Sequence, residues 1–267
     1  LEILLKKTGM ARATYYYHTK RLQEPDENED IRQSIRRIYE THKGRYGYRR
    51  VTAQLRSDGI TINHKKVQKL MVEMKLQGKR KKVRYKSYKG EVGKIAPNII
   101  DRDFVAAAPN QKWTTDVTEV KIKDKKIYLS PILDMFNGEI ISYSISYSPN
   151  QHMVMTMLDK AFKKTPILTG LVLHSDQGIH YQHHRYQKAL KDKDIIQSMS
   201  RKGNCLDNAM MENFFGLMKS ELLYLQEWDS VEQFKKELIK YIHYYNNDRI
   251  KLRLNGKSPV QYRALFQ

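Results

Sequence analysis

The sequence contains a single cysteine, Cys205, among 267 residues. One cysteine excludes any disulfide within the chain and fits a reducing cytosol. No apolar run approaches the ~20 residues that a bilayer-spanning helix needs, and no signal peptide is visible. The chain starts at Leu1 rather than at a methionine, as a piece of a longer product would. We therefore expect a cytoplasmic protein without a membrane partner.

Acidic side chains are scarce between residues 31 and 90. This stretch has 19 lysines and arginines against three acids, so it carries 16 of the 20 net positive charges of the chain. A short run of positive charge is usually a solvated surface. A basic excess this long instead favours a polyanionic partner, and the obvious one is double-stranded DNA.

Two short helices are predicted inside the basic stretch. Residues 49–58 form the first, which Gly59 ends, and Asn63 caps a second helix that runs to Leu76. Their apolar residues face inward and their lysines face outward. This pattern is typical of a small helical DNA-binding unit.

From Gln111 the sequence becomes rich in β-branched residues. The segments KWTTDVTEVKI, KIYLSPILDMF and EIISYSISY predict three antiparallel strands, with Asn137-Gly138 as a hairpin signal before the third. Pro131 inside the second strand indicates an edge position or a bulge. The continuous apolar run in LTGLVLHSD predicts a buried parallel strand, and helices are expected around it. A mixed α/β sheet follows from this order.

Three carboxylates occupy unusual places in these elements. Asp116 lies in the first strand, where a lone Asp needs a cap, a partner or a ligand. Asp176 directly follows the buried strand, where α/β sheets collect their ligands. Glu212 lies beside the apolar stripe of an amphipathic helix, and Lys219 lies two turns further along the same face. Singly, each acid is equally compatible with a turn, a cap or a loose surface ion pair.

Together, the three acids predict a metal site. Crowded carboxylates repel one another unless a cation lies among them. Mg²⁺ prefers a few carboxylates with water and phosphate, and two such ions about 4 Å apart stabilise an in-line phosphoryl displacement.

The segments WTTDVT, HSDQG and SRKGNCLDNAMMENFFGLMKSE resemble the three signatures of the catalytic core of DDE transposases and retroviral integrases. The spacing agrees, because 35 residues separate Asp176 from Glu212. The chain is similar to second-frame transposases of the IS-three family of bacterial insertion sequences, of the IS-one-fifty type. YGYRRVTAQLRSDGITINHKKVQKLM resembles their upstream helix-turn-helix, and YYNNDRIKLRLNGKSPVQYR resembles their C-terminal tail. Lys251 stands where many relatives carry a histidine.

The resemblance implies a ribonuclease-H-like, mixed five-stranded sheet with flanking helices, after a small all-helical DNA-binding region. Asp116, Asp176 and Glu212 would be the catalytic residues and would bind two Mg²⁺ (or Mn²⁺) ions, and Lys219 would touch the end DNA. The implied enzyme cleaves at insertion-sequence ends and catalyses strand transfer. The domains we expect are the tail of a helix-turn-helix segment (1–25), a helical DNA-binding domain (26–78), a basic linker (79–108) and an integrase core with its C-terminal helix and tail (109–267).

The expected partners are element ends and target DNA, further copies of the chain on that DNA, and an upstream-frame helix-turn-helix protein. When bound, this bacterial cytoplasmic protein would be associated with the nucleoid. The further side chains expected to contact DNA are Arg49, Arg50, Lys65, Lys66, Lys69, Arg80, Lys81 and Lys82.

Two other functions stay open at this point: a ribonuclease-H-like nuclease without strand transfer, and a DNA-binding regulator with an inactive core. Four histidines around Asp176 could suggest zinc, but they form no helical His-x-x-x-His pair. For Asp134 we favour a role beside the hairpin turn, and for Asp207 we favour a cap on the Glu212 helix. Cys205 is expected to be a small packed residue.

Overall fold

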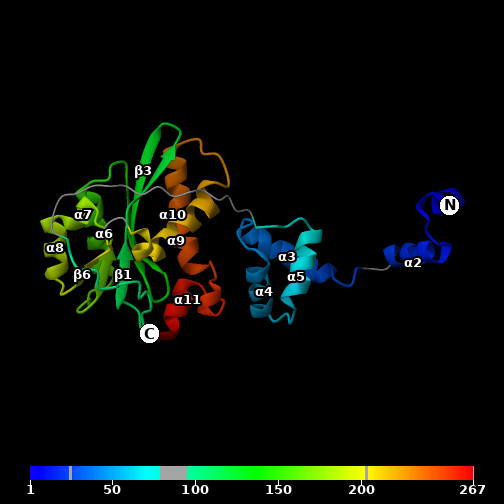
Figure 1. Cartoon of the computed structure of the whole chain (residues 1–267), viewed down its shortest axis with the longest axis horizontal. Coiled ribbons are helices and arrows are strands. Elements are labelled where there is room, and N and C mark those ends of the chain that lie inside the picture. The colour runs from blue at the N-terminus through cyan, green and yellow to red at the C-terminus, as the bar shows by residue number, and fades with distance from the viewer. Residues whose placement is uncertain (24–25, 79–94, 202–203, 267) are drawn as a thin grey trace. The chain divides into compact units, whose positions relative to one another are not determined.

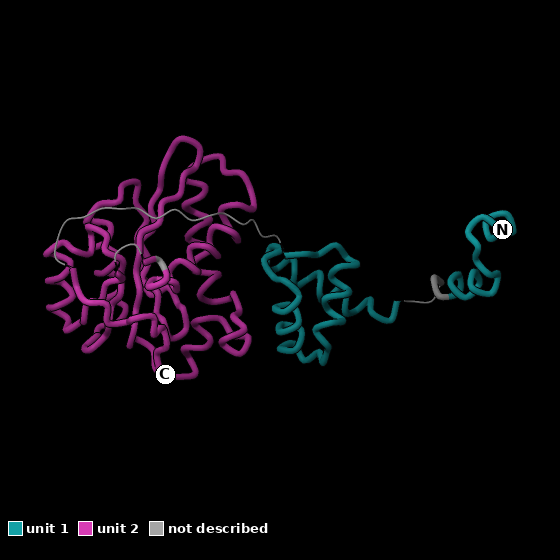
Figure 2. Tube along the Cα trace, in the orientation of Figure 1, with its two compact units in different colours: residues 1–78 teal, residues 79–267 magenta. Residues whose placement is uncertain are grey.

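The computed structural model describes residues 1–23, 26–78, 95–201 and 204–266. The chain divides into two compact units, Leu1–Gly78 and Lys79–Gln267 (Figure 2). Within the described residues, no helix is both long enough and apolar enough to cross a membrane. Three of the predicted DNA contacts, Arg80, Lys81 and Lys82, lie outside these residues, as does the side chain of Cys205.

The first unit is helical. Its helices are α1 (Glu2–Thr8), α2 (Arg12–Gln23), α3 (Glu29–Thr41), α4 (Tyr48–Ser57) and α5 (His64–Glu73). The predicted cap of α5 is confirmed, because the Asn63 side chain accepts a hydrogen bond from the Lys65 N–H at 2.9 Å. The apolar faces of α3, α4 and α5 meet in a small core built from Ile35, Ile38, Val51, Leu55, Val67, Leu70 and Met71.

The second unit contains a mixed sheet. Its strands are β1 (Lys112–Thr115), β2 (Thr118–Ile122), β3 (Lys125–Asp134), β4 (Ile140–Ser146), β5 (Val172–Ser175) and β6 (Ile196–Met199). β1 and β2 both pair antiparallel with one edge of β3, and β4 pairs with the other edge. β5 lies parallel to β1, and β6 lies parallel to β5. The six strands therefore fill five positions across the sheet, as the ribonuclease-H-like prediction requires.

The prediction of one continuous first strand was wrong, because that strand is broken at Asp116 and Val117. Thr115 pairs with Ile132 and Thr118 pairs with Leu129, so the register of the ladder is the same on both sides of the break. This register sets Asp116 opposite Pro131. Proline has no N–H to donate to the ladder, and its carbonyl instead accepts the Thr115 hydroxyl at 2.8 Å.

Pro131 itself is not at a sheet edge, because β3 is flanked on both sides. The alternative that the sequence left open, a bulge, lies one residue further on, where the β3–β4 register shifts between Ile132 and Leu133.

Helices cover both faces of the sheet (Figure 1). One apolar core lies between the sheet and α6 (Gln151–Lys164), α7 (Ile179–Gln182) and α8 (His184–Lys191). A second core lies between the other face and α9 (Ala209–Met218) and α10 (Val231–Asn247). The remaining elements are η1 (Cys205–Asn208), η2 (Lys219–Leu223), η3 (Leu252–Leu254), α11 (Pro259–Arg263) and η4 (Ala264–Phe266).

The predicted stripe of the Glu212 helix is confirmed, because Met211, Phe215, Met218 and Leu222 are all buried. The helix is not regular throughout, however. It is an α-helix as far as Met218 and continues as the π-helix η2, in which the Tyr224 N–H bonds to the Lys219 carbonyl at 2.9 Å. Single π-helical turns are rare in proteins, and those that do occur are frequently found at functional sites.

Candidate active site

Asp116 and Asp176 lie at matched positions on neighbouring parallel strands. The β1–β5 register pairs Lys112 with Val172 and Thr114 with His174, a constant offset that aligns Asp116 with Asp176 just beyond the paired residues. Neighbouring strands are about 4.8 Å apart, so the two carboxylates leave the same end of the sheet side by side. Both side chains are half-buried.

Each aspartate is held by a backbone donor close in sequence. Oδ1 of Asp116 accepts the Val117 N–H at 2.7 Å, inside the strand break. Oδ1 of Asp176 accepts the Gly178 N–H at 2.9 Å. A Cβ atom at residue 178 would lie 2.8 Å from that same oxygen, so a larger residue there would displace the Asp176 carboxylate.

Glu212 is brought to this end of the sheet by a contact that the sequence did not reveal. Asn208, just before α9, accepts the Thr114 hydroxyl at 2.5 Å and donates to the Thr115 carbonyl at 3.2 Å. These bonds tie the start of α9 to the last two residues of β1. Glu212, one turn into α9, is half-buried and close enough to Asp116 for its charge to act on that carboxylate.

The electrostatics agree with a crowded set of acids. Burial raises the pKa of Asp116 well above its usual value, and the charges of Asp176 and Glu212 raise it further. Burial also raises the pKa values of the Asp176 and Glu212 carboxyls. A cation among these groups would stabilise their charged forms.

Lys219 lies at the rim of the same cluster. Its side chain is half-buried, and burial lowers the pKa of its amine, while the charges of Asp116 and Glu119 act in the opposite direction. Because Lys219 is close enough to Asp116 for each charge to affect the other, it could contact a phosphate at the site.

The donor set suits a hard divalent ion, because Asp116, Asp176 and Glu212 offer only carboxylate oxygens. In the described part of the chain, no three His, Cys, Asp or Glu side chains already stand close enough together to hold a metal ion. Binding would therefore need these oxygens to move closer to a common point.

Two other acids have structural roles. Asp134 is fully buried and pairs with the Arg263 guanidinium at 2.6 Å. The prediction that Asp207 caps the Glu212 helix was wrong, because Asn208 occupies the N-cap position. Asp207 instead binds Arg201 at 2.9 Å and Arg102 at 3.0 Å, and these arginines hold its pKa well below the usual range.

His174 and Lys251, which the sequence singled out, both have structural contacts. His174 is buried beneath the strand end, bonds to Ser198 at 2.9 Å, and has its pKa lowered to about 4 by burial. Lys251 bonds to the Gly138 carbonyl at 3.1 Å and to the Tyr245 hydroxyl at 2.7 Å. Lys251 therefore holds the hairpin turn.

The other predicted DNA contacts lie in the first unit. Arg49 and Arg50 are on α4, where each lies over a tyrosine ring, and Lys65, Lys66 and Lys69 are exposed on α5. These cations belong to a different compact unit from the carboxylates.

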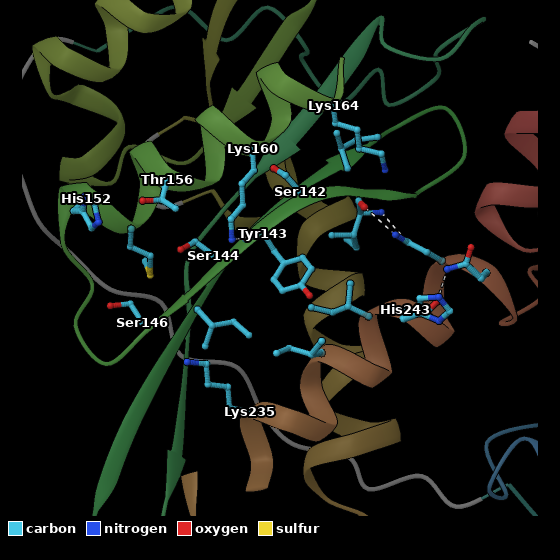
Figure 3. A pocket seen from close by; sticks show the side chains of 18 residues that line it. Ser142, Tyr143, Ser144, Ser146, His152, Thr156, Lys160, Lys164, Lys235 and His243 are labelled. Atoms are coloured by element: carbon cyan, nitrogen blue, oxygen red, sulfur yellow. Dashed lines mark hydrogen bonds between the residues drawn. The ribbon is translucent and has the colours of Figure 1, made fainter. Parts of the chain in front are cut away.

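A groove of about 870 Å³ lies between β4, α6 and α10 (Figure 3). Its polar lining includes Lys160, Lys164, Lys235, Tyr143 and three serines of β4, Ser142, Ser144 and Ser146. The lining that the structure describes includes no Asp or Glu, so this groove offers no carboxylate ligand to a magnesium ion.

Comparison with known proteins agrees with this architecture. Two integrase core domain models match residues 106–205 and 212–265, and an HTH-like domain model matches residues 25–84. A putative transposase InsK for insertion sequence element IS150 of Escherichia coli (strain K12) is 52% identical over 98% of this chain and 93% of its own length. An uncharacterized transposase-like protein of Haemophilus influenzae is 51% identical over 80% of this chain and 98% of its own length.

Among solved structures, the HTLV-2 integrase catalytic core domain in complex with magnesium aligns with a TM-score of 0.48 and 22% identity, over 59% of this chain and 98% of that one. An HTH-like domain beside an integrase core implies DNA binding, and integrase cores use divalent metal ions. The 52% identity to that putative transposase extends over nearly the full length of both chains. The chain therefore belongs to the IS3 family of insertion-sequence transposases, which are DDE polynucleotidyl transferases with an integrase catalytic core.

Proposed function

We propose that Asp116, Asp176 and Glu212 are the catalytic triad of this transposase and hold two Mg²⁺ (or Mn²⁺) ions. The observation that carries this assignment is the β1–β5 register, which sets the two aspartates side by side while Asn208 ties the Glu212 helix to the same strand end. Two bound ions would stabilise the attacking and leaving oxygens of a phosphoryl displacement.

The reaction has two steps of the same type. In the first, a water oxygen bonds to phosphorus at the element end as the bond to the 3′ oxygen breaks, which leaves a 3′-OH and a 5′-phosphate. In the second, that 3′-OH attacks a target phosphodiester, and the target's own 3′ oxygen leaves as a hydroxyl. Neither step needs a covalent bond between protein and DNA.

The residues of the chain have separate tasks in these steps. The three carboxylates act in their charged forms, which a divalent ion favours. Lys219 contacts a phosphate of the end DNA as a point charge. Asn208 and Gly178 keep Glu212 and Asp176 at the strand ends.

The first unit would bind the element ends. Its exposed lysines on α5 and the arginines on α4 form the basic surface, within the proposed DNA-binding domain 26–78. The proposed linker 79–108 would join this domain to a catalytic core over 109–267. On the DNA we infer more than one copy of the chain, because two element ends must be joined together, and an upstream-frame helix-turn-helix protein is a further proposed partner.

The decisive experiment incubates the purified protein with labelled, pre-cut element-end DNA, supercoiled plasmid and Mg²⁺. Strand transfer moves the label into the plasmid, and Asp176→Asn serves as the inactive control. A nuclease without strand transfer would nick the plasmid and leave it unlabelled, which would exclude the second step.

A further inference from the structure

A buried ion pair lies directly behind the Glu212 helix. The Arg249 guanidinium meets the Glu221 carboxylate with two bonds, Nη2–Oε1 at 2.6 Å and Nε–Oε2 at 2.8 Å. The Tyr241 hydroxyl donates to the same carboxylate at 3.1 Å. Arg249 is 1% exposed and Glu221 is 7% exposed. Each of these buried charges depends on the other, because removing either one would leave an uncompensated charge in the protein interior.

Glu221 belongs to the π-helix η2, whose first residue is Lys219. Helix residues two positions apart point to nearly opposite sides. Glu221 accordingly points to Tyr241 on α10 and to Arg249. Lys219 extends from the other side of the turn, and its amine is close enough to Asp116 and Glu119 for their charges to act on its pKa. Glu221 therefore anchors this π-helical turn on the side opposite Lys219.

Arg249 is itself held firmly. Its N–H bonds to the Tyr244 carbonyl at 2.9 Å at the end of α10, and its guanidinium lies over the Tyr245 ring, 5.7 Å from the centroid. The bidentate contact thus connects η2 to a rigid helix end rather than to a mobile surface side chain.

We propose that Arg249 and Glu221 are positioning residues, which hold η2 in its π-helical form and so keep Lys219 beside the carboxylates, ready to meet a phosphate of the DNA end. This assignment rests on the proposed role of Lys219. A pair that merely glued the C-terminal segment to the core would stabilise the protein without acting through Lys219.

A double-mutant cycle separates these two roles. Strand transfer of labelled end DNA is measured for Glu221→Gln, for Lys219→Ala and for the double variant. Each single change should slow joining about tenfold to a hundredfold, since losing or misplacing a charged contact has effects of that size. The double variant should be no slower than Lys219→Ala alone, within about twofold, because the pair acts through a side chain that is already gone. If the rate loss in the double variant is instead the product of the two single losses, the positioning role is overturned.

The matched control is Glu139→Gln. Glu139 is also a buried glutamate, 3% exposed, that contacts a lysine and an arginine, Lys164 at 2.8 Å and Arg263 at 2.5 Å. It belongs to the turn between β3 and β4, at the opposite end of the strands from Asp116. Any loss of joining in this variant should multiply with that of Lys219→Ala. If it too is masked by Lys219→Ala, masking is not specific to the pair and the inference fails.

Tyr241→Phe removes one hydrogen bond to Glu221 and leaves the ion pair, so it tests the same link if Glu221→Gln does not fold. Joining should fall severalfold, again with no further loss in the Lys219→Ala background. If Lys219→Ala itself joins DNA at the wild-type rate, the proposed role of Lys219 fails. If Lys219→Ala is slow but the second change multiplies that loss, only the positioning role fails.

Discussion

Asn208 joins the start of the Glu212 helix to Thr114 in the first strand of the sheet, through a hydrogen bond of 2.5 Å between buried side chains. Its amide also reaches the Thr115 carbonyl, one residue before Asp116. Two residues that are 94 positions apart in sequence thus fix the distance between a strand carboxylate and a helix carboxylate.

Replacing Asn208 by Ala should lower both stability and activity. Two hydrogen bonds of buried groups are lost, so we expect a destabilisation of about 1–3 kcal/mol in denaturant unfolding. Strand transfer should fall by more than this stability loss explains, because the helix start is no longer tied to β1. Asn213→Ala, at an exposed position of the same helix, is the control. Equal activity in the two variants would show that the tie has no part in the site.

Gly178→Ala should damage the site and leave the fold intact. The φ angle of Gly178 is −61°, which alanine adopts freely, but its Cβ would lie 2.8 Å from the Asp176 carboxylate and push it aside. We expect strand transfer to fall about tenfold to a hundredfold, as a displacement of about 1 Å at a reacting centre does.

Gly216→Ala provides the matched comparison, because a Cβ there meets nothing within 4 Å. It lies inside α9, so alanine should stabilise the protein by about 1 kcal/mol and leave strand transfer unchanged. If both glycine variants behave alike, crowding of Asp176 is not the reason for the glycine at 178.

In the metal-free protein, the contribution of Asp116 to stability should fall as the pH rises, while buried His174, whose pKa is lowered to about 4, contributes with the opposite sign. The folded-state pKa of Asp116 lies above its unfolded value, because of burial and the charge of Asp176. Between these two pKa values the fold keeps a proton that the unfolded chain has released, so the stability falls as pH rises from the unfolded pKa through the folded one. The difference in melting temperature between the wild type and Asp116→Asn from pH 4 to pH 8, in the presence of a chelator, measures this contribution, because His174 is common to both proteins.

Asp116→Asn should flatten that fall, because the amide does not titrate. Glu119→Gln is the control, since its neighbours, chiefly the Tyr128 hydroxyl, lower the pKa of Glu119 and give the opposite sign. Added Mg²⁺ should restore stability at the high-pH end in the wild type and in Glu119→Gln but not in Asp116→Asn, because a ligand that binds only the folded state stabilises it. A pH profile of Asp116→Asn that matches the wild type would contradict the crowding of these acids.

Sequence patterns predicted most of the architecture, because the helices and strands that they identify depend on residues close together in the sequence. The cap at Asn63 and the apolar stripe of α9 are local features of this kind. The break at Asp116 could not be predicted, because it depends on Pro131 lying opposite in another strand. The π-helix at Lys219 was missed for a similar reason, since Glu221 meets a partner 28 residues away.

Binding of element-end DNA should weaken steeply with salt, and Lys69→Ala should reduce that dependence. Each phosphate neutralised by a lysine releases counterions, so one lost contact lowers the slope of log affinity against log salt by about 0.9. Lys69 is exposed on α5, and Lys163→Ala, at an exposed position on α6 of the other unit, is the control. A slope that Lys69→Ala leaves unchanged would remove this side chain from the DNA-binding surface.

The role of the three carboxylates is tested most directly by comparing cleavage with end binding in Glu212→Gln. The amide keeps the shape of the side chain and loses the negative charge that a divalent ion needs. Cleavage and joining of labelled element-end DNA in Mg²⁺ should fall by at least about a thousandfold, while the affinity for that DNA stays within about twofold. Cleavage at the wild-type rate, or an equal loss of cleavage and binding, would contradict the assignment of Glu212 to the catalytic triad.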